Sequence, residues 1–139
     1  NNMFEELKEI SLKQCGSKKP RVFLEVGTSP LITAGRSSYL NDLVIYAGGE
    51  NIAQDIGSGF FRIAKEKILE SNPDYIVVIS ESYISSRNFW SKYGFLNAVV
   101  RNNIVEANAD LFSRPNPVNF IRAVYLLKRI ICPEVFGED

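Results

Sequence analysis

The side chains that most often carry out catalysis are scarce in this chain. It contains no histidine, and its two cysteines, Cys15 and Cys132, lie far apart in the sequence. Histidine is the commonest general base and transition-metal ligand, and two distant cysteines do not form a zinc site alone. A serine beside a glutamate, as in Ser80-Glu81-Ser82, is poor evidence for a nucleophile when no histidine can activate it. We therefore expect no catalytic centre, no metal site and no cofactor, and the cysteines leave open either a structural disulfide or two free thiols.

The sequence also lacks the short motifs of α/β enzymes. No GxGxxG, P-loop or GxSxG pattern occurs in it. The Gly48-Gly49 pair follows a helical pattern instead of a strand, which makes it a poor phosphate-binding loop. An enzyme on a flavodoxin-like or Rossmann-like layer is therefore a minor alternative to a binding protein.

Aromatic and basic side chains lie in the expected loops or beside strand ends, where they could contact a ligand. Phe60 and Phe61 follow Gly57-Ser58-Gly59, and an apolar pair on such a flexible loop is hard to bury locally. For each aromatic residue, ordinary core packing is the alternative, and Arg114 could instead hold its own loop through backbone carbonyls. The candidate ligand-contacting residues are Phe60, Phe61, Arg36, Tyr83, Trp90, Phe112 and Arg114.

Composition limits the class of protein. The chain has 139 residues, enough for one domain with a real core, and 16 basic residues balance 16 acidic ones. This balance gives no reason to expect binding to nucleic acid or to an anionic membrane surface. No apolar run approaches the roughly 20 residues of a membrane helix. We expect no signal peptide in this stretch, so that the chain is either cytosolic or has lost its N-terminus.

The stretch from Arg21 to Ala53 organises the expected fold. Arg21–Val26 is a short apolar run typical of an interior strand. After a turn-rich crossing, apolar residues from Tyr39 to Ala47 recur at helical spacing, and Gly48-Gly49 suit a left-handed helix end. A strand that leads into a helix packed back on the sheet begins a doubly wound layer.

The remaining elements alternate in the same manner. Tyr75–Ile79 is the most hydrophobic run and predicts a central parallel strand. The order predicts a three-layer α/β/α sandwich with a mostly parallel sheet. Further helices are expected over 2–14, 63–71, 96–101 and 120–131, a short helix or turn over 88–93, a strand over 103–107, and loops over 51–59 and 110–119.

These pieces resemble the C-terminal lobe of the class III substrate-binding proteins of ABC importers, which bind vitamin B12, ferric siderophores or haem. The resemblance covers about residues 20–136, and it rests on the order and spacing of pieces that are each weak alone. The matching pieces are Pro20–Val26, Thr33-Ala34-Gly35, Leu43–Ala53 with AGGENIA, Ile63–Leu69 with Glu66, Asn72-Pro73-Asp74-Tyr75-Ile76, Ala98–Val105 and Phe112-Ser113-Arg114-Pro115-Asn116-Pro117.

The resemblance implies a lobe of a two-lobed protein that captures its ligand with modest relative motion. Residues 1–19 would be the end of the interlobe helix and a linker, residues 20–139 the C-terminal α/β lobe, and the N-terminal lobe would be absent from this chain. The location would be periplasmic or extracytoplasmic, with a lipoprotein anchor outside this chain. An isolated lobe is expected to bind its ligand weakly or not at all, and to self-associate through its exposed apolar face.

The resemblance also assigns partners. The implied partners are a metal-chelate or corrinoid ligand, which is large, flat and partly apolar, and the importer's permease, on which Glu66 would dock through permease arginines. A solvated helix glutamate is the alternative for Glu66. Two residues depart from the family pattern: Val118 stands where an Arg is frequent, and Ala64 where a Ser or Thr often caps the helix. A stand-alone interaction or signalling module remains the other hypothesis.

Overall fold

The computed structural model describes residues 18–107 and 116–133, together with residues 5, 9, 110 and 112. The expected interlobe segment lies almost wholly outside this part of the chain. Within the described ranges, no helix is both long and apolar enough to cross a membrane.

A parallel four-stranded sheet forms the centre of the molecule. The strand order is β4-β1-β6-β7, so the chain passes from β1 to one neighbour, β4, and later returns to the other side of β1 as β6. The point between β1 and β6 is therefore where the strand order reverses. The strands are β1 (Arg21–Glu25), β4 (Glu50–Asn51), β6 (Tyr75–Val78) and β7 (Ile104–Glu106).

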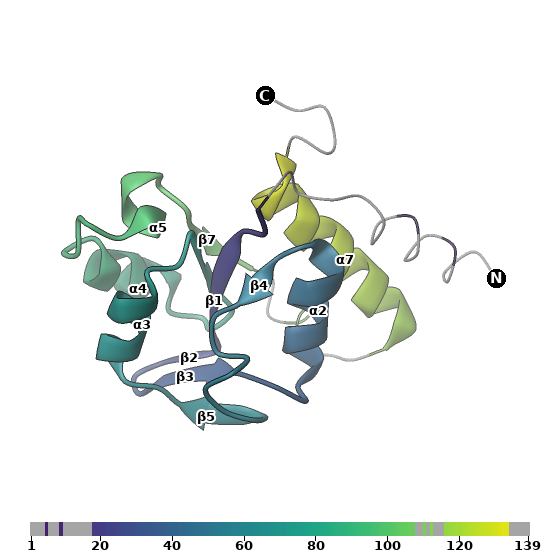
Figure 1. Cartoon of the computed structure of the whole chain (residues 1–139), viewed down its shortest axis with the longest axis horizontal. Coiled ribbons are helices and arrows are strands. Elements are labelled where there is room, and N and C mark those ends of the chain that lie inside the picture. Colours follow the sequence, from purple (N-terminus) through teal and green to yellow (C-terminus); the bar gives the residue numbers. More distant parts are fainter. Residues whose placement is uncertain are drawn as a thin grey trace.

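Helices cover both faces of this sheet, which confirms the predicted three-layer sandwich (Figure 1). On one face two helices pack against each other. The shorter helices lie on the opposite face (Figure 1). The first pair is α2 (Tyr39–Ala47) and α7 (Pro117–Ile131), and the second group is α3 (Lys65–Ser71), α4 (Tyr83–Trp90) and α5 (Asn97–Val100).

The pleat of the strands divides the core into two clusters. Val22 and Leu24 of β1 pack toward α2 and α7, whereas Phe23 packs toward α3, α4 and α5. Successive side chains of a strand point to opposite faces. Glu25 stands two residues after Phe23 and therefore falls on the same side of the sheet. The sequence thus places a carboxylate on the α4 side of the sheet.

A second, antiparallel sheet was not predicted. Its strand order is β2-β3-β5, and it lies beside the C-terminal end of β1 (Figure 1). The glycines, serines and proline of this region predicted turns instead of strands. The structure places short strands within it, at β2 (Gly27–Thr28), β3 (Leu31–Ala34) and β5 (Phe60–Arg62).

Helix α2 begins and ends as its sequence predicts. The Ser38 hydroxyl accepts a hydrogen bond from the backbone N–H of Asn41, and Gly48 adopts the left-handed conformation at φ 96°. Gly49 has a different role, because a Cβ there would lie 2.9 Å from the Ile131 side chain. At the far end of α7, Cys132 is fully buried and disulfide-bonded. Cys15, the only other cysteine in the sequence, lies outside the described residues.

Candidate ligand-binding site

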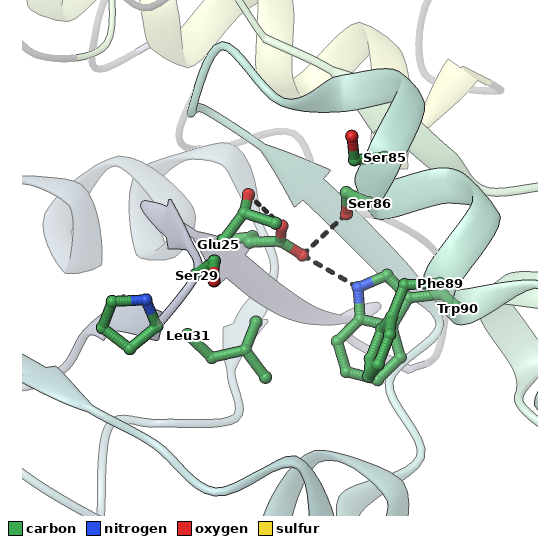
Figure 2. A pocket seen from close by; sticks show the side chains of 9 residues that line it. Glu25, Ser29, Leu31, Ser85, Ser86, Phe89 and Trp90 are labelled. Atoms are coloured by element: carbon green, nitrogen blue, oxygen red, sulfur yellow. Dashed lines mark hydrogen bonds between the residues drawn. The ribbon is translucent and has the colours of Figure 1, made fainter.

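The carboxyl ends of β1 and β6 meet where the strand order reverses. In open α/β sheets, ligands bind in the crevice outside this point. Glu25 is the last residue of β1, and Ser80 follows two residues after the end of β6. The β2–β3 hairpin and α4 lie on either side of Glu25 in Figure 2. This edge of the sheet is therefore the first place to look for a site.

Glu25 is completely buried there and accepts three hydrogen bonds. Its Oε1 accepts from the Ser86 hydroxyl and from the Trp90 indole Nε1–H, each at 2.8 Å. Its Oε2 accepts from the Thr28 hydroxyl at 2.6 Å (Figure 2). An indole N–H can only donate, so these contacts suit an ionised, acceptor-only carboxylate. One buried charge therefore ties the β2 strand and helix α4 to the end of β1.

The hydroxyl groups around Glu25 have a fixed order of donation. The Thr28 and Ser80 hydroxyls are 2.7 Å apart, and the Thr28 hydrogen is already donated to Glu25. The Ser80 hydroxyl must therefore donate to Thr28, and it accepts in turn from the Ser82 backbone N–H at 3.3 Å. Every hydrogen in this chain of contacts points toward the carboxylate. The oxygens of Thr28 and Ser86 consequently have lone pairs, but no hydrogens, to offer to anything else.

A pocket of about 420 Å³ opens beside this network. The turn at Ser29-Pro30 and the start of β3 form one side of it, and α4 forms the other (Figure 2). The walls are mostly apolar, with hydroxyl groups between them. The lining residues are Glu25, Thr28, Ser29, Pro30, Leu31, Ser85, Ser86, Phe89 and Trp90.

The small antiparallel sheet has an inner and an outer face. Thr33 pairs with Phe61 and Ile32 pairs with Arg62, and directly paired residues share a face. Leu31, Thr33 and Phe61 form the inner face, with Thr33 buried and the other two packed on the core beside α4. The outer face carries Phe60, which is 62% exposed, and the exposed Arg62. An aromatic ring left in solvent on a paired strand is available to a ligand.

The structure brings some of the predicted contact residues to this outer region. Phe60 lies on it, and Phe61 turns inward from the same strand. Arg36 is exposed beside it and donates from Nη1 to the Gln54 carbonyl at 3.0 Å, which holds the loop that precedes β5. Contact of these three residues with a ligand stays a prediction.

The other predicted contact residues lie elsewhere. Trp90 is fully buried and reaches only the pocket next to Glu25, and Phe112 is buried in the core between the sheet and α7. The Tyr83 hydroxyl donates to the Ile104 carbonyl at 3.1 Å, a contact that fixes α4 to β7. Arg114 lies outside the described residues. Glu66 is exposed in the first turn of α3, and its contact with a permease stays a prediction.

Sequence reasoning did not find Glu25, Thr28 or Ser86. A signal for Glu25 was present, because an acidic residue inside the buried run RVFLEV must find buried donors. Its partners Ser86 and Trp90 are 61 and 65 residues away, and no spacing rule identifies them. Among the described residues, no cluster of three or more acidic or cysteine side chains could hold a metal ion.

Comparison with known proteins finds similarity to vitamin B12-binding proteins of bacteria. No family model matches the chain. The vitamin B12-binding protein of Salmonella paratyphi A is 26% identical over 117 residues, which are 83% of this chain and 42% of that protein. The vitamin B12-binding protein of Yersinia pseudotuberculosis is 28% identical over 116 residues, which are 82% of this chain and 39% of that protein. The chain therefore spans about two fifths of the length of these relatives.

Solved structures of periplasmic binding proteins also match this chain. A possible iron-binding, periplasmic solute-binding protein from Staphylococcus epidermidis is 27% identical and matches with a TM-score of 0.75 over 94% of this chain and 54% of its own. Along most of its length the chain is therefore similar to periplasmic binding proteins, vitamin B12-binding members among them, and its fold is that of one lobe of such a protein. The fold is also that of the vitamin B12-binding protein BtuF of Vibrio cholerae, with a TM-score of 0.80 at 22% identity over 97% of this chain and 52% of that one.

This similarity confirms several predictions. Periplasmic binding proteins are not enzymes, so the expectation of a binding protein holds. The chain corresponds in extent to about one half of the BtuF structure, and thus to one lobe of a two-lobed protein. The family is extracytoplasmic, as the resemblance implied, whereas a lipoprotein anchor stays a prediction.

Proposed function

We propose that this chain is the C-terminal lobe of the substrate-binding component of an ABC importer that carries a metal chelate. The cargo would be cobalamin, a ferric siderophore or haem. The observation that carries this proposal is the likeness to vitamin B12-binding proteins along 83% of the chain, on a fold that matches BtuF. Assignment to the C-terminal lobe is supported by the family order of the sequence pieces from Pro20 to Pro117.

The outer face of the antiparallel sheet supports a cargo of this kind. Phe60 is mostly exposed there, and a flat, partly apolar chelate can pack on such a ring. Arg36 is exposed near the same strand and would attract an anionic substituent such as a propionate or a catecholate. We assign Phe60 and Arg36 to the ligand side of this lobe, facing a second lobe that supplies the remaining contacts.

Glu66 supports the permease side of the proposal. It lies in the first turn of α3, where no other acidic residue is present, and its side chain is exposed. A carboxylate at a helix N-terminus is favoured by the helix dipole and remains free to pair with arginines of a partner. We propose that α3 presents Glu66 to the permease while the outer sheet face holds the cargo.

The test is a titration of the full-length protein with cyanocobalamin, haemin and a panel of ferric siderophores. Binding is followed by the visible spectrum of each ligand and by the fluorescence of Trp90, the only tryptophan in this chain. We expect submicromolar affinity for one ligand class. The 139-residue chain alone, measured in parallel, should bind the same ligand at least about 100-fold more weakly, because half of the contacts are missing. Failure of every ligand to bind would contradict the proposal and favour an interaction module.

A further inference from the structure

The pocket next to Glu25 is separate from the outer sheet face assigned to the cargo. Leu31 lines the pocket, whereas Phe60 pairs with Ala34, three residues further along β3 and on the opposite face. Three residues of strand correspond to about 10 Å, and the pleat turns the two side chains away from each other. The pocket therefore needs an explanation of its own.

We propose that this pocket binds a small apolar group that ends in a hydrogen-bond donor, a primary ammonium or a primary amide, and that it discriminates against a carboxylate. The proposal concerns this lobe alone and does not depend on the identity of the transported cargo. Three properties of the pocket carry it: the sign of its charge, the direction of its hydrogen bonds and the nature of its walls.

The charge at the base of the pocket is negative and is not paired. All the partners of Glu25 are neutral: two hydroxyls and one indole. No lysine or arginine in the described part of the chain forms an ion pair with it. A fully buried charge is screened far less than a charge in water, so a second anion in the pocket would be repelled. The Lys92 ammonium lies over the Phe89 ring, 4.7 Å from the ring centroid, but Lys92 is exposed and its charge is therefore well screened.

The hydroxyl groups at the base can accept but not donate. The Thr28 and Ser86 hydrogens are both directed at Glu25. A carboxylate ligand has only acceptors, so it would meet a lone pair at the partly exposed Thr28 oxygen. An ammonium or an amide NH₂ brings a donor that the Thr28 oxygen can accept, whereas Ser86 is completely buried and acts through Glu25. Ser29 and Ser85 at the rim are exposed, and their free hydroxyls do not decide between the two kinds of ligand.

The walls suit an apolar body of modest size. Leu31 faces Phe89 and Trp90 across the space in Figure 2, and Pro30 also lines the pocket. Aromatic faces attract cations as well as apolar groups, and the Lys92 ammonium already lies over the Phe89 ring. A volume of about 420 Å³ accommodates a phenylethyl group with its terminal polar atom.

The experiment compares three probes of one shape on the 139-residue chain: phenethylammonium, phenylacetamide and phenylacetate. The indole N–H of Trp90 donates to Glu25 and gives a single indole resonance in a ¹⁵N–¹H spectrum, because the chain has one tryptophan. We expect the ammonium and the amide to shift this resonance with affinities about 10-fold or more above that of the carboxylate. The proposal would be overturned if phenylacetate bound as tightly as the other two probes. It would also be overturned if no probe shifted the resonance at a concentration of about 20 mM, where even very weak binding is detected.

Variants separate the charge from the shape of the pocket. Glu25→Gln keeps the volume and the acceptor for Trp90 but removes the charge, so the preference should fall to about twofold or less. Ser86→Ala keeps the charge and should keep the preference. Ser85→Phe adds a ring at the exposed rim and should abolish binding of all three probes. Binding that survives Ser85→Phe, or a preference unchanged in Glu25→Gln, would place recognition elsewhere. The probe comparison on the unmodified chain decides the matter even where Glu25→Gln does not fold.

Discussion

Glu25 shows how one residue can serve the fold and a site together. A buried carboxylate is costly unless donors satisfy it, and here three side chains do so within 2.8 Å. The same three contacts fix Thr28 on one side of the pocket and Ser86 and Trp90 on the other. The relative position of the β2–β3 hairpin and α4 therefore depends on a single side chain at the end of β1.

Tyr39 presents the opposite case, a buried polar atom that no described residue satisfies. Its hydroxyl oxygen is buried without a hydrogen-bond partner, while its ring packs against Phe120 at a centroid distance of 5.7 Å. Phenylalanine would keep the ring and remove the unsatisfied group. We expect Tyr39→Phe to leave stability unchanged or to raise it by up to about 1 kcal/mol, as measured by urea unfolding. The exposed Tyr46 provides the matched control, and Tyr46→Phe should have no effect.

The pH dependence of stability gives a second measure of Tyr39. Desolvation by burial raises the pKa of Tyr39 above the usual 10.0. Above pH 10 the unfolded chain loses this proton more readily than the folded chain, so folding stability falls as the pH rises through this range. Tyr39→Phe should reduce that alkaline loss. A loss of the same size in wild type and variant would show that Tyr39 does not contribute to it.

At the scale of elements, the glycine at position 35 controls how the loop before β5 packs. A Cβ on Gly35 would overlap the Gly57 carbonyl oxygen and would lie 2.9 Å from that of Ala53. The Gly35 N–H also donates to the Gly59 carbonyl at 2.9 Å. Both contacts involve backbone, which cannot move aside as a side chain can.

We therefore expect Gly35→Ala to destabilise the fold by about 1–3 kcal/mol, because the 53–59 loop must shift. Amide resonances of β5 should shift with it, since this loop leads into Phe60. Gly94→Ala is the matched control: a Cβ there meets nothing within 4 Å, and the change should cost less than about 0.5 kcal/mol. Chemical denaturation and amide spectra check both. Equal stability of the two variants would contradict the close packing at Gly35.

How far the sequence predicts these elements depends on their length. The β1 and β6 strands, helix α2 and helix α7 were predicted, because each has a long apolar run or a clear helical period. The antiparallel sheet was missed, since its strands span two to four residues and the segments next to them are dense in turn formers. The Phe60 ring was correctly expected to be hard to bury, but its place in a strand depends on pairing with Ala34, 26 positions earlier. The hydrogen bonds of Glu25 were missed because its partners Ser86 and Trp90 are also far away along the chain.

At the scale of the whole molecule, docking on a permease predicts a charge effect confined to one position on α3. Glu66→Lys should lower cargo uptake by about 10-fold or more in cells that contain the cognate permease, because a Glu–Arg pair becomes repulsive. Ligand affinity of the purified full-length protein should change by less than about twofold, since Glu66 lies outside the proposed ligand face. Glu70→Lys, an exposed acidic residue at the other end of the same helix, is the control. Equal loss of uptake in both variants would show a general effect of charge.

An unpaired lobe exposes the apolar groups that a second lobe and a ligand would cover. Phe60 is 62% exposed, and Ile56 on the loop before it is 41% exposed. We expect the 139-residue chain to self-associate at concentrations of about 100 µM and above, in the weak range typical of small apolar contacts. Phe60→Ser should shift this association to higher concentration. Sedimentation velocity over a dilution series measures both.

The control for this prediction is Ile84, which is 69% exposed on α4 and away from the outer face of the antiparallel sheet. Ile84→Ser removes a similar apolar area, so it should leave association unchanged if the Phe60 face is the contact. A strictly monomeric profile at every concentration would contradict the prediction. An effect of Ile84→Ser without one of Phe60→Ser would move the contact to α4. If both serine variants weaken association equally, exposed apolar area in general drives the association. The face that carries Phe60 would then not be a specific contact surface for a second lobe.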